Sequence, residues 1–186
     1  MRIEKAKLKL IACMCEGGAE TAIMDILLDN DLLIFNREQL IDETVIPRTS
    51  VRTFEKNYLR REYDNKVLVL RVIDSRNEQF NLSKAYRHQV VDVINVITAP
   101  EIEMLIIVSE NKHKEFCNSE IKKPSVYCKS ILKLKDVKSP EFIKEYFSDV
   151  KRLVDSIIEY HRVHEQKHNE ASIYDLLKNK NRRGKT

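Results

Sequence analysis

The chain is poor in glycine, with 3 among its 186 residues. Ordinary usage of about 7% would give roughly 13. Neither a G-x-G-x-x-G fingerprint nor a G-K-[ST] sequence is present, which argues against the dinucleotide and P-loop phosphate sites that those motifs build. The G-x-S-x-G sequence that exposes a serine nucleophile is also absent.

Cysteine and long apolar runs are scarce as well. Cys13 and Cys15 form one pair inside an apolar stretch, while Cys117 and Cys128 stand alone, so neither a zinc site nor a disulfide framework is indicated. No apolar stretch approaches the ~18 residues that a membrane span requires, and the charged N-terminal residues do not resemble a signal peptide. We therefore expect a protein of the reducing cytoplasm with no membrane association.

What the chain does have is charge. Hydrophobic residues make up 42% and charged residues 33%, which is typical of a globular protein with a strongly charged surface. The 33 basic and 29 acidic side chains leave a net charge of +4, a weak argument on its own for binding nucleic acid. The length suits one domain with a small appendage.

Strand and helix patterns alternate in the first part of the chain. This alternation predicts an α/β fold with a mostly parallel, Rossmann-like sheet flanked by helices. Pro100 is expected in the first turn of its helix, where proline is favoured. Strands are predicted at 8–15, 32–35, 66–73 and 90–97, and helices at 19–29, 50–63, 83–89 and 101–109.

The rest of the chain is predicted to be helical. Residues 139–164 read as one long helix with a wide apolar stripe, and residues 171–178 as a short one. We therefore divide the chain into an α/β core at 1–125 and a helical extension at 126–186 that packs on it, with a basic tail at 178–186. Surplus apolar surface on the long helix could pair with a second copy of the chain or with a partner protein.

Two acidic residues end two of the predicted strands. Glu16 follows the first strand, directly before Gly17 and Gly18, and Asp74 follows the strand at 66–73. Ligands of open α/β sheets bind beyond the carboxyl ends of the strands, and glycine lets the backbone approach a ligand closely. The alternative is that the acids and glycines only form tight turns.

Further acids lie close to these two in sequence. Glu20 and Glu78 each follow a strand-end acid by four residues, and Glu20 could instead complement the helix dipole. Magnesium prefers hard oxygen ligands, usually one or two carboxylates together with water and phosphate oxygens. The pattern therefore predicts a divalent-metal site built around Glu16 and Asp74.

One predicted helix carries a basic stripe. Arg52, Lys56 and Arg60 recur every four residues, so a helix over 50–63 places them on one face. Such a face could bind a phosphate backbone, whose charge dominates nucleic-acid affinity. A solvated helix face with no ligand is an equally good interpretation.

Three segments together resemble Toprim domains. Residues 15–20 (CEGGAE) resemble the E-G-x-x-[DE] opening, and residues 72–76 (VIDSR) fall where those domains carry D-x-D. Residues 97–105 (ITAPEIEML) resemble the P-x-x-E-x-[WL]-L segment of the RloB-like and AbiLii-like branch. The segments occur in the right order and span roughly residues 8 to 110.

The resemblance implies a Toprim-type core that binds Mg²⁺ or Mn²⁺ and acts on phosphodiesters. It makes Glu16 the general acid/base and Asp74 a metal ligand, with Glu20, Glu78 and Glu103 as further candidates. Glu103 would be the glutamate of the branch's own signature. RloB-like proteins resemble phage-defence components that are often encoded beside an ATPase, so an ATPase partner is implied as well.

One position departs from the family pattern. Arg76 stands where the second acid of D-x-D is expected; an arginine would repel a cation, although it could bind a substrate phosphate. Two hypotheses follow: a Mg²⁺-dependent nuclease, or a degenerate, non-catalytic module that binds a partner ATPase or nucleic acid. An Arg76 side chain lying among the acids and paired with Glu16 would favour the second.

Overall fold

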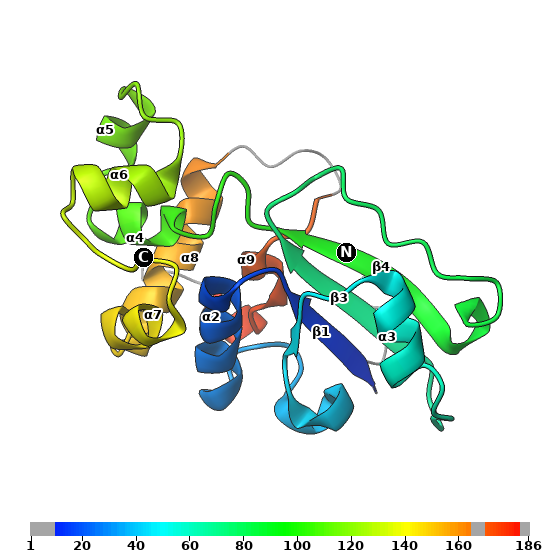
Figure 1. Cartoon of the computed structure of the whole chain (residues 1–186). Helices are drawn as coiled ribbons and strands as arrows, with labels where there is room; N and C mark the ends of the chain where they lie inside the picture. Colours follow the sequence, from blue (N-terminus) through cyan, green and yellow to red (C-terminus); the bar gives the residue numbers. More distant parts are fainter. Residues whose placement is uncertain (1–9, 165–169, 183–186) are drawn as a thin grey trace.

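The protein is built around a four-stranded sheet in which every neighbouring pair of strands is parallel (Figure 1). The computed structural model describes residues 10–164 and 170–182. The strand order is β2-β1-β3-β4. This arrangement, with helices on both faces, is the α/β, Rossmann-like fold that the sequence predicts. The strands are β1 (Ile11–Cys15), β2 (Ile46–Pro47), β3 (Val67–Ile73) and β4 (Val90–Ile97).

Burial explains why these segments form strands. Every residue of β1 and β3 is buried, as expected for central parallel strands covered on both faces. Their register pairs Ile11 with Leu68 and Cys15 with Val72. β4 lies at the edge of the sheet, and most of its residues are only partly buried.

Each face of the sheet has its own apolar core. On one face Ala12, Met14 and Val69 pack with Phe54 of α3 (Val51–Tyr58). On the other face Cys13, Leu70 and Val72 pack with α2 (Gly18–Asp29), which begins directly after β1. Figure 1 shows α3 in front of the sheet and α9 behind it.

The later helices complete the second core. α8 packs against α4, and α7 against α2, so the predicted extension shares its core with the α/β part. The division into a core and an extension stays a prediction. These helices are α4 (Met104–Ser109), α5 (His113–Cys117), α6 (Pro124–Ser130), α7 (Pro140–Tyr146), α8 (Val150–Val163) and α9 (Ile173–Leu176).

The prediction of one long helix at 139–164 is wrong. The chain turns at Ser148 between α7 and α8, and each helix has its own cap. Ser139 accepts a hydrogen bond from the Phe142 N–H, and Asp149 accepts one from the Lys151 N–H. Such caps satisfy N–H groups that a helix start leaves unpaired, so they favour two helices over one.

Four other predicted segments also differ. Residues 32–35 form no strand, although Leu33 makes an isolated bridge to Leu177. The helix at 50–63 ends at Tyr58. Pro100 lies outside its helix, because α4 begins at Met104. The predicted helix at 83–89 reduces to a single 3₁₀ turn. The 3₁₀ turns are η1 (Arg37–Gln39), η2 (Ile41–Glu43), η3 (Arg87–Gln89) and η4 (Asn179–Asn181).

No helix in the described part of the chain is long and apolar enough to cross a membrane. The predicted basic tail at 178–186 is described as far as Arg182. Lys178 forms an ion pair with Asp31, and the Arg182 guanidinium lies over the Tyr174 ring, 5.7 Å from its centroid. This part of the tail therefore packs on the protein, and residues 183–186 lie outside the described residues.

Candidate functional site

The topology brings two predicted site residues together. β1 and β3 are neighbours, but the chain leaves β1 toward β2 on one side and leaves β3 toward β4 on the other. Such a switch point opens a crevice beyond the carboxyl ends of the two strands. Glu16 and Asp74 are the first residues after these strands, and the Asp74 N–H donates a hydrogen bond of 2.9 Å to Glu16 Oε2.

Glu20 joins the same edge from the first turn of α2. Its side chain lies over Gly17, where an added Cβ would be 2.8 Å from Glu20 Oε2. Burial raises the pKa of Glu20, and the negative charges of Glu16 and Asp74 raise it further. We call Glu16, Glu20 and Asp74 the acidic edge, because their carboxyl groups are close enough to affect one another's charge.

The two glycines also serve the packing of the chain itself. Gly17 leaves room for Glu20, while a Cβ on Gly18 would be 3.0 Å from Pro140 Cδ and 3.3 Å from the Lys138 carbonyl oxygen. Gly18 therefore lets the start of α7 approach the start of α2. A contact of Gly17 and Gly18 with a substrate stays a prediction.

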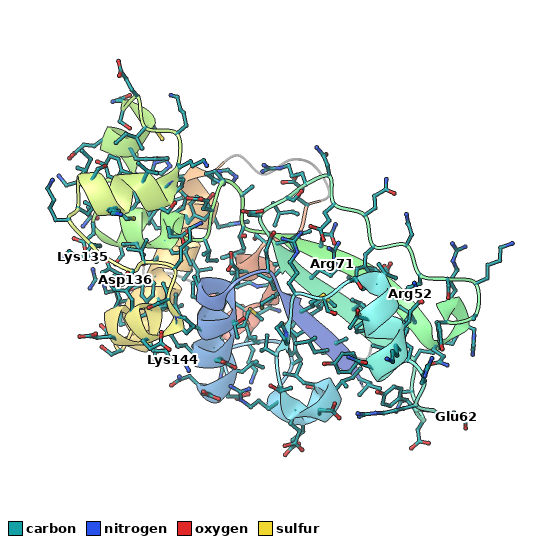
Figure 2. The ribbon with its side chains drawn as sticks, in the orientation of Figure 1. Arg52, Glu62, Arg71, Lys135, Asp136 and Lys144 are labelled. Carbon is teal, nitrogen blue, oxygen red and sulfur yellow. The ribbon has the colours of Figure 1, made fainter. Side chains whose placement is uncertain are left out.

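Both carboxylate oxygens of Glu78 are already paired with arginines, which makes Glu78 a poorer metal ligand. Arg48 donates a 2.8 Å hydrogen bond to Glu78 Oε2 and a second, short one to Glu16 Oε1. Arg71, which is 2% exposed, pairs with Glu78 Oε1 and donates to Asn95 Oδ1 at 3.2 Å. Arg48 therefore links Glu16 to Glu78, and Arg71 anchors Glu78 to the sheet (Figure 2 labels Arg71).

Arg76 does not lie on Glu16. Its Nε donates a 2.7 Å hydrogen bond to Glu170, which follows the gap in the described residues after α8. The cation paired with Glu16 is instead Arg48, which follows β2 at the same edge of the sheet. Arg76 thus pairs with Glu170, and Arg48 makes the pairing with Glu16 that was considered for Arg76.

A second group of charges lies beside the acidic edge. Glu103 is 2% exposed, and burial raises its pKa to about 7; the neighbouring carboxylates of Glu101 and Glu20 contribute, while Lys138 opposes the shift. Lys138 Nζ lies 3.1 Å from Glu101 Oε1 and 4.0 Å from Glu103 Oε1. Glu103 therefore lies within electrostatic reach of Glu20, with Lys138 partly neutralising the group.

A ready-made site with three metal ligands is not present in the described ranges, 10–164 and 170–182. Mg²⁺ needs fewer protein ligands than that, because water and substrate phosphate oxygens supply the others. Glu16 and Asp74 provide hard carboxylate oxygens on adjacent strand ends. Burial is the main cause of the raised pKa of Glu20, and the negative charges of Glu16 and Asp74 add to it, a repulsion that a cation would relieve. The acidic edge thus fits a divalent cation held by one or two carboxylates.

The basic stripe is shorter than predicted. Arg52 and Lys56 lie on α3, but Arg60 lies beyond the end of the helix at Tyr58. All three side chains are exposed, and none forms an ion pair within the described part of the chain. Figure 2 shows Arg52 on α3.

Three residues of the site were not identified from the sequence. They are Arg48, Arg71 and Lys138. The acidic partners of Arg48 and Lys138 are 30 or more residues away in the chain, whereas Arg71 pairs with Glu78, 7 residues away. Arg71 carries a recognisable signal: it is the one charged residue within the apolar strand at 67–73, and a buried arginine requires a partner. Arg48 and Lys138 are exposed side chains in loops, with no comparable pattern.

Comparison of the chain with protein-family models, with curated proteins and with solved structures found no match in any of the three. The Toprim resemblance of the three short segments therefore stays a prediction. The arrangement of the strand ends and the charges gathered there are the features that indicate a function.

Proposed function

We propose that this protein cleaves phosphodiester bonds of nucleic acid at the acidic edge with the help of Mg²⁺ or Mn²⁺. The observation that carries the proposal is the placement of Glu16 and Asp74 on adjacent strand ends at the switch point, joined by the 2.9 Å hydrogen bond between them. A role in phage defence, which the resemblance implies, belongs to the same proposal.

The proposal assigns the binding of the cation to the carboxylates at and beside the strand ends. Glu16 and Asp74 would hold the cation, with Glu20 and Glu103 as further carboxylates on the α2 and α4 side. A bound divalent cation would stabilise negative charge on the phosphodiester and lower the pKa of a water molecule. Glu78 is a weaker candidate ligand, because Arg48 and Arg71 already pair with it.

The remaining steps fall to side chains of this chain. Glu16 is the general acid/base of the proposal, since its carboxylate is partly exposed at the strand ends and accepts a hydrogen bond from the Asp74 N–H. Arg48 is half exposed and could turn its guanidinium from Glu16 to a substrate phosphate. The exposed Arg52 and Lys56 of α3 would bind the backbone of the strand, and Arg76 would bind phosphate if released from Glu170.

The test is calorimetric titration of Mg²⁺ and Mn²⁺ into the wild type, Glu16→Gln and Asp74→Asn, together with a cleavage assay on mixed DNA and RNA. Saturable binding and cleavage should both be lost in the two variants. Asp64→Asn is the matched control, because Asp64 is an exposed acid that lies before the amino end of β3, whereas Glu16 and Asp74 lie at the carboxyl ends of their strands. A wild type that neither binds a cation nor cuts would refute the proposal.

One observation favours the alternative function. Glu16 already pairs with Arg48, and in a degenerate site such a pair would fill the place of the cation. The alternative is a non-catalytic module that binds a partner ATPase or nucleic acid. Arg48→Ala separates the two: a nuclease should bind Mn²⁺ more tightly once the competing guanidinium is removed, whereas a degenerate site should still bind none.

A further inference from the structure

The positive charge of the chain is concentrated in two segments, the basic tail at 178–186 and residues 112–138. Residues 112–138, which we call the lysine segment, contain eight lysines and three acidic residues, a net charge of +5. The whole chain carries only +4, so everything outside this segment sums to −1. The weak overall charge therefore conceals a strongly basic segment, which comprises α5, α6 and the loop that follows them.

Most of these lysines are free to bind a ligand. Lys112 pairs with Glu115, and Lys138 with Glu101. The other six lysines are exposed and form no ion pair with any described residue: Lys114, Lys122, Lys123, Lys129, Lys133 and Lys135. Exposed cations without internal partners are those that a phosphate backbone can engage without first breaking an ion pair.

The segment also forms an open groove. Lys129 and Lys138 line it together with the apolar side chains of Val126, Leu134 and Val137. The backbone takes positive φ values at Lys133 and Asp136, 59° and 53°, where the chain turns from α6 toward α7. Figure 2 shows Lys135 and Asp136 at this turn, on the side of the molecule that faces away from β4.

The groove ends next to the candidate site. The N–H of Ser125, a groove residue, donates a 2.8 Å hydrogen bond to Glu101 Oε2, and Lys138 Nζ contacts Glu101 Oε1 at 3.1 Å. Lys138 Nζ also lies 4.0 Å from Glu103 Oε1, so the groove reaches the carboxylates beside the acidic edge. A polyanion is repelled by the carboxylates of that edge, and a flanking basic surface is what would hold it there.

We propose that the lysine segment binds the sugar-phosphate backbone of a nucleic acid strand and guides it to the acidic edge. This inference rests on the proposed function and extends it by naming the surface that holds the substrate. Lysine is a point charge on a flexible stem, which suits phosphate contacts that carry no sequence information. The resulting binding is independent of base sequence and strongly dependent on salt.

The experiment measures binding of a fluorescently labelled oligonucleotide by anisotropy, in EDTA, over a range of salt concentrations. The test variant is Lys129→Gln with Lys135→Gln. The matched control is Lys66→Gln with Lys84→Gln, since both lysines are exposed, unpaired within the described residues, and close to the starts of β3 and β4 at the opposite edge. All four substitutions replace exposed side chains, and circular dichroism checks that each variant is folded.

The test variant should lose at least about tenfold in affinity at low salt, and its slope of log affinity against log salt should fall by about 1.4–1.8, the value for two lost phosphate contacts. The control should keep the wild-type slope. A test variant that behaves like the wild type, a wild type that binds no oligonucleotide, or a wild type that binds polyglutamate equally well would each overturn the inference.

The nuclease proposal and the lysine-segment proposal can each be refuted without refuting the other. The binding assay contains no divalent cation, so its outcome does not depend on Glu16 or Asp74. Lysine-dependent binding without cleavage would refute the nuclease and leave the lysine segment as a nucleic-acid surface. Cleavage that is unaffected by Lys129→Gln with Lys135→Gln would leave the nuclease standing and overturn this inference.

Discussion

Glu103 should make the stability of the protein depend on pH. The carboxyl group is 2% exposed, and burial is the largest of the effects that raise its pKa from 4.5 to about 7. Each tenfold change in proton affinity corresponds to about 1.4 kcal/mol, so ionising Glu103 in the folded protein costs about 3 kcal/mol. The unfolded chain does not have this cost, because its glutamate ionises near the ordinary value.

The direction of the change in stability with pH depends on whether the folded or the unfolded state binds more protons. Between about pH 4.5 and pH 7 the folded protein holds a proton on Glu103 that the unfolded chain has released, so the contribution of Glu103 to stability falls as pH rises. Glu103→Gln removes this dependence. The variant should resemble the wild type near pH 4.5 and exceed its free energy of unfolding by up to about 3 kcal/mol near pH 8.

Urea unfolding at several pH values measures the difference. Glu141→Gln is the control: Glu141 is exposed on α7 and forms no ion pair in the described part of the chain, so it should change little at any pH. A Glu103→Gln effect that is the same at pH 4.5 and pH 8 would show that ionisation of Glu103 is not what destabilises the protein. A variant that is less stable than the wild type near pH 8 would show that Lys138 compensates the buried charge fully.

Three further predictions concern the residues around the site. Arg71→Met should lower the free energy of unfolding by about 2 kcal/mol in urea, because Glu78 and Asn95 lose a buried donor; a loss below about 0.5 kcal/mol would contradict this. Gly18→Ala should destabilise by about 1 kcal/mol or more through its contact with Pro140, whereas Gly17→Ala meets only the flexible end of Glu20 and should cost less; the reverse order would be inconsistent with the packing. Arg76→Ala should leave Mn²⁺ affinity within about twofold of the wild type, since Arg76 pairs with Glu170; a clear gain in affinity by calorimetry would place it among the acids.

The central strands were predictable because burial dictates their composition. The predicted strands at 66–73 and 90–97 match β3 (Val67–Ile73) and β4 (Val90–Ile97), and β1 falls within the predicted 8–15. Buried parallel strands require nearly continuous β-branched and leucine residues, a pattern that solvent-facing segments do not share. Residues 32–35 have a similar composition, but there tertiary packing left only the single bridge at Leu33.

The break between α7 and α8 depends on helix capping, which the apolar periodicity of the sequence does not report. The apolar spacing of residues 139–164 continues across Ser148, so it predicts one helix. The Asp149 carboxylate, however, accepts the Lys151 N–H and starts a new helix in another direction. This allows α7 to pack on α2 while α8 packs on α4. A serine and an aspartate before an apolar run are a start signal in the sequence itself.

The acids of the site could be predicted, but their cationic partners could not. Glu16 and Asp74 are fixed at the strand ends, and the parallel topology brings such ends together whatever the loops do. Arg48 and Lys138 reach the site from loops, and their positions depend on how β2 and α7 pack. Arg76 illustrates the opposite error. Its position two residues after Asp74 suggested that it lies among the acids, but its side chain pairs with Glu170 instead.

The charges at the strand ends bear on how the site would respond to a substrate. Glu16 of the acidic edge is paired with Arg48, and Glu103 beside that edge lies 4.0 Å from Lys138; both cationic side chains are more than half exposed. Exposed ion pairs are weak, and their partners exchange readily. A phosphate arriving at the edge could therefore draw Arg48 and Lys138 away from the carboxylates and leave those carboxylates free for a divalent cation. Substrate and cation should then bind cooperatively, with the oligonucleotide increasing the affinity for Mn²⁺ in the wild type but not in Arg48→Ala.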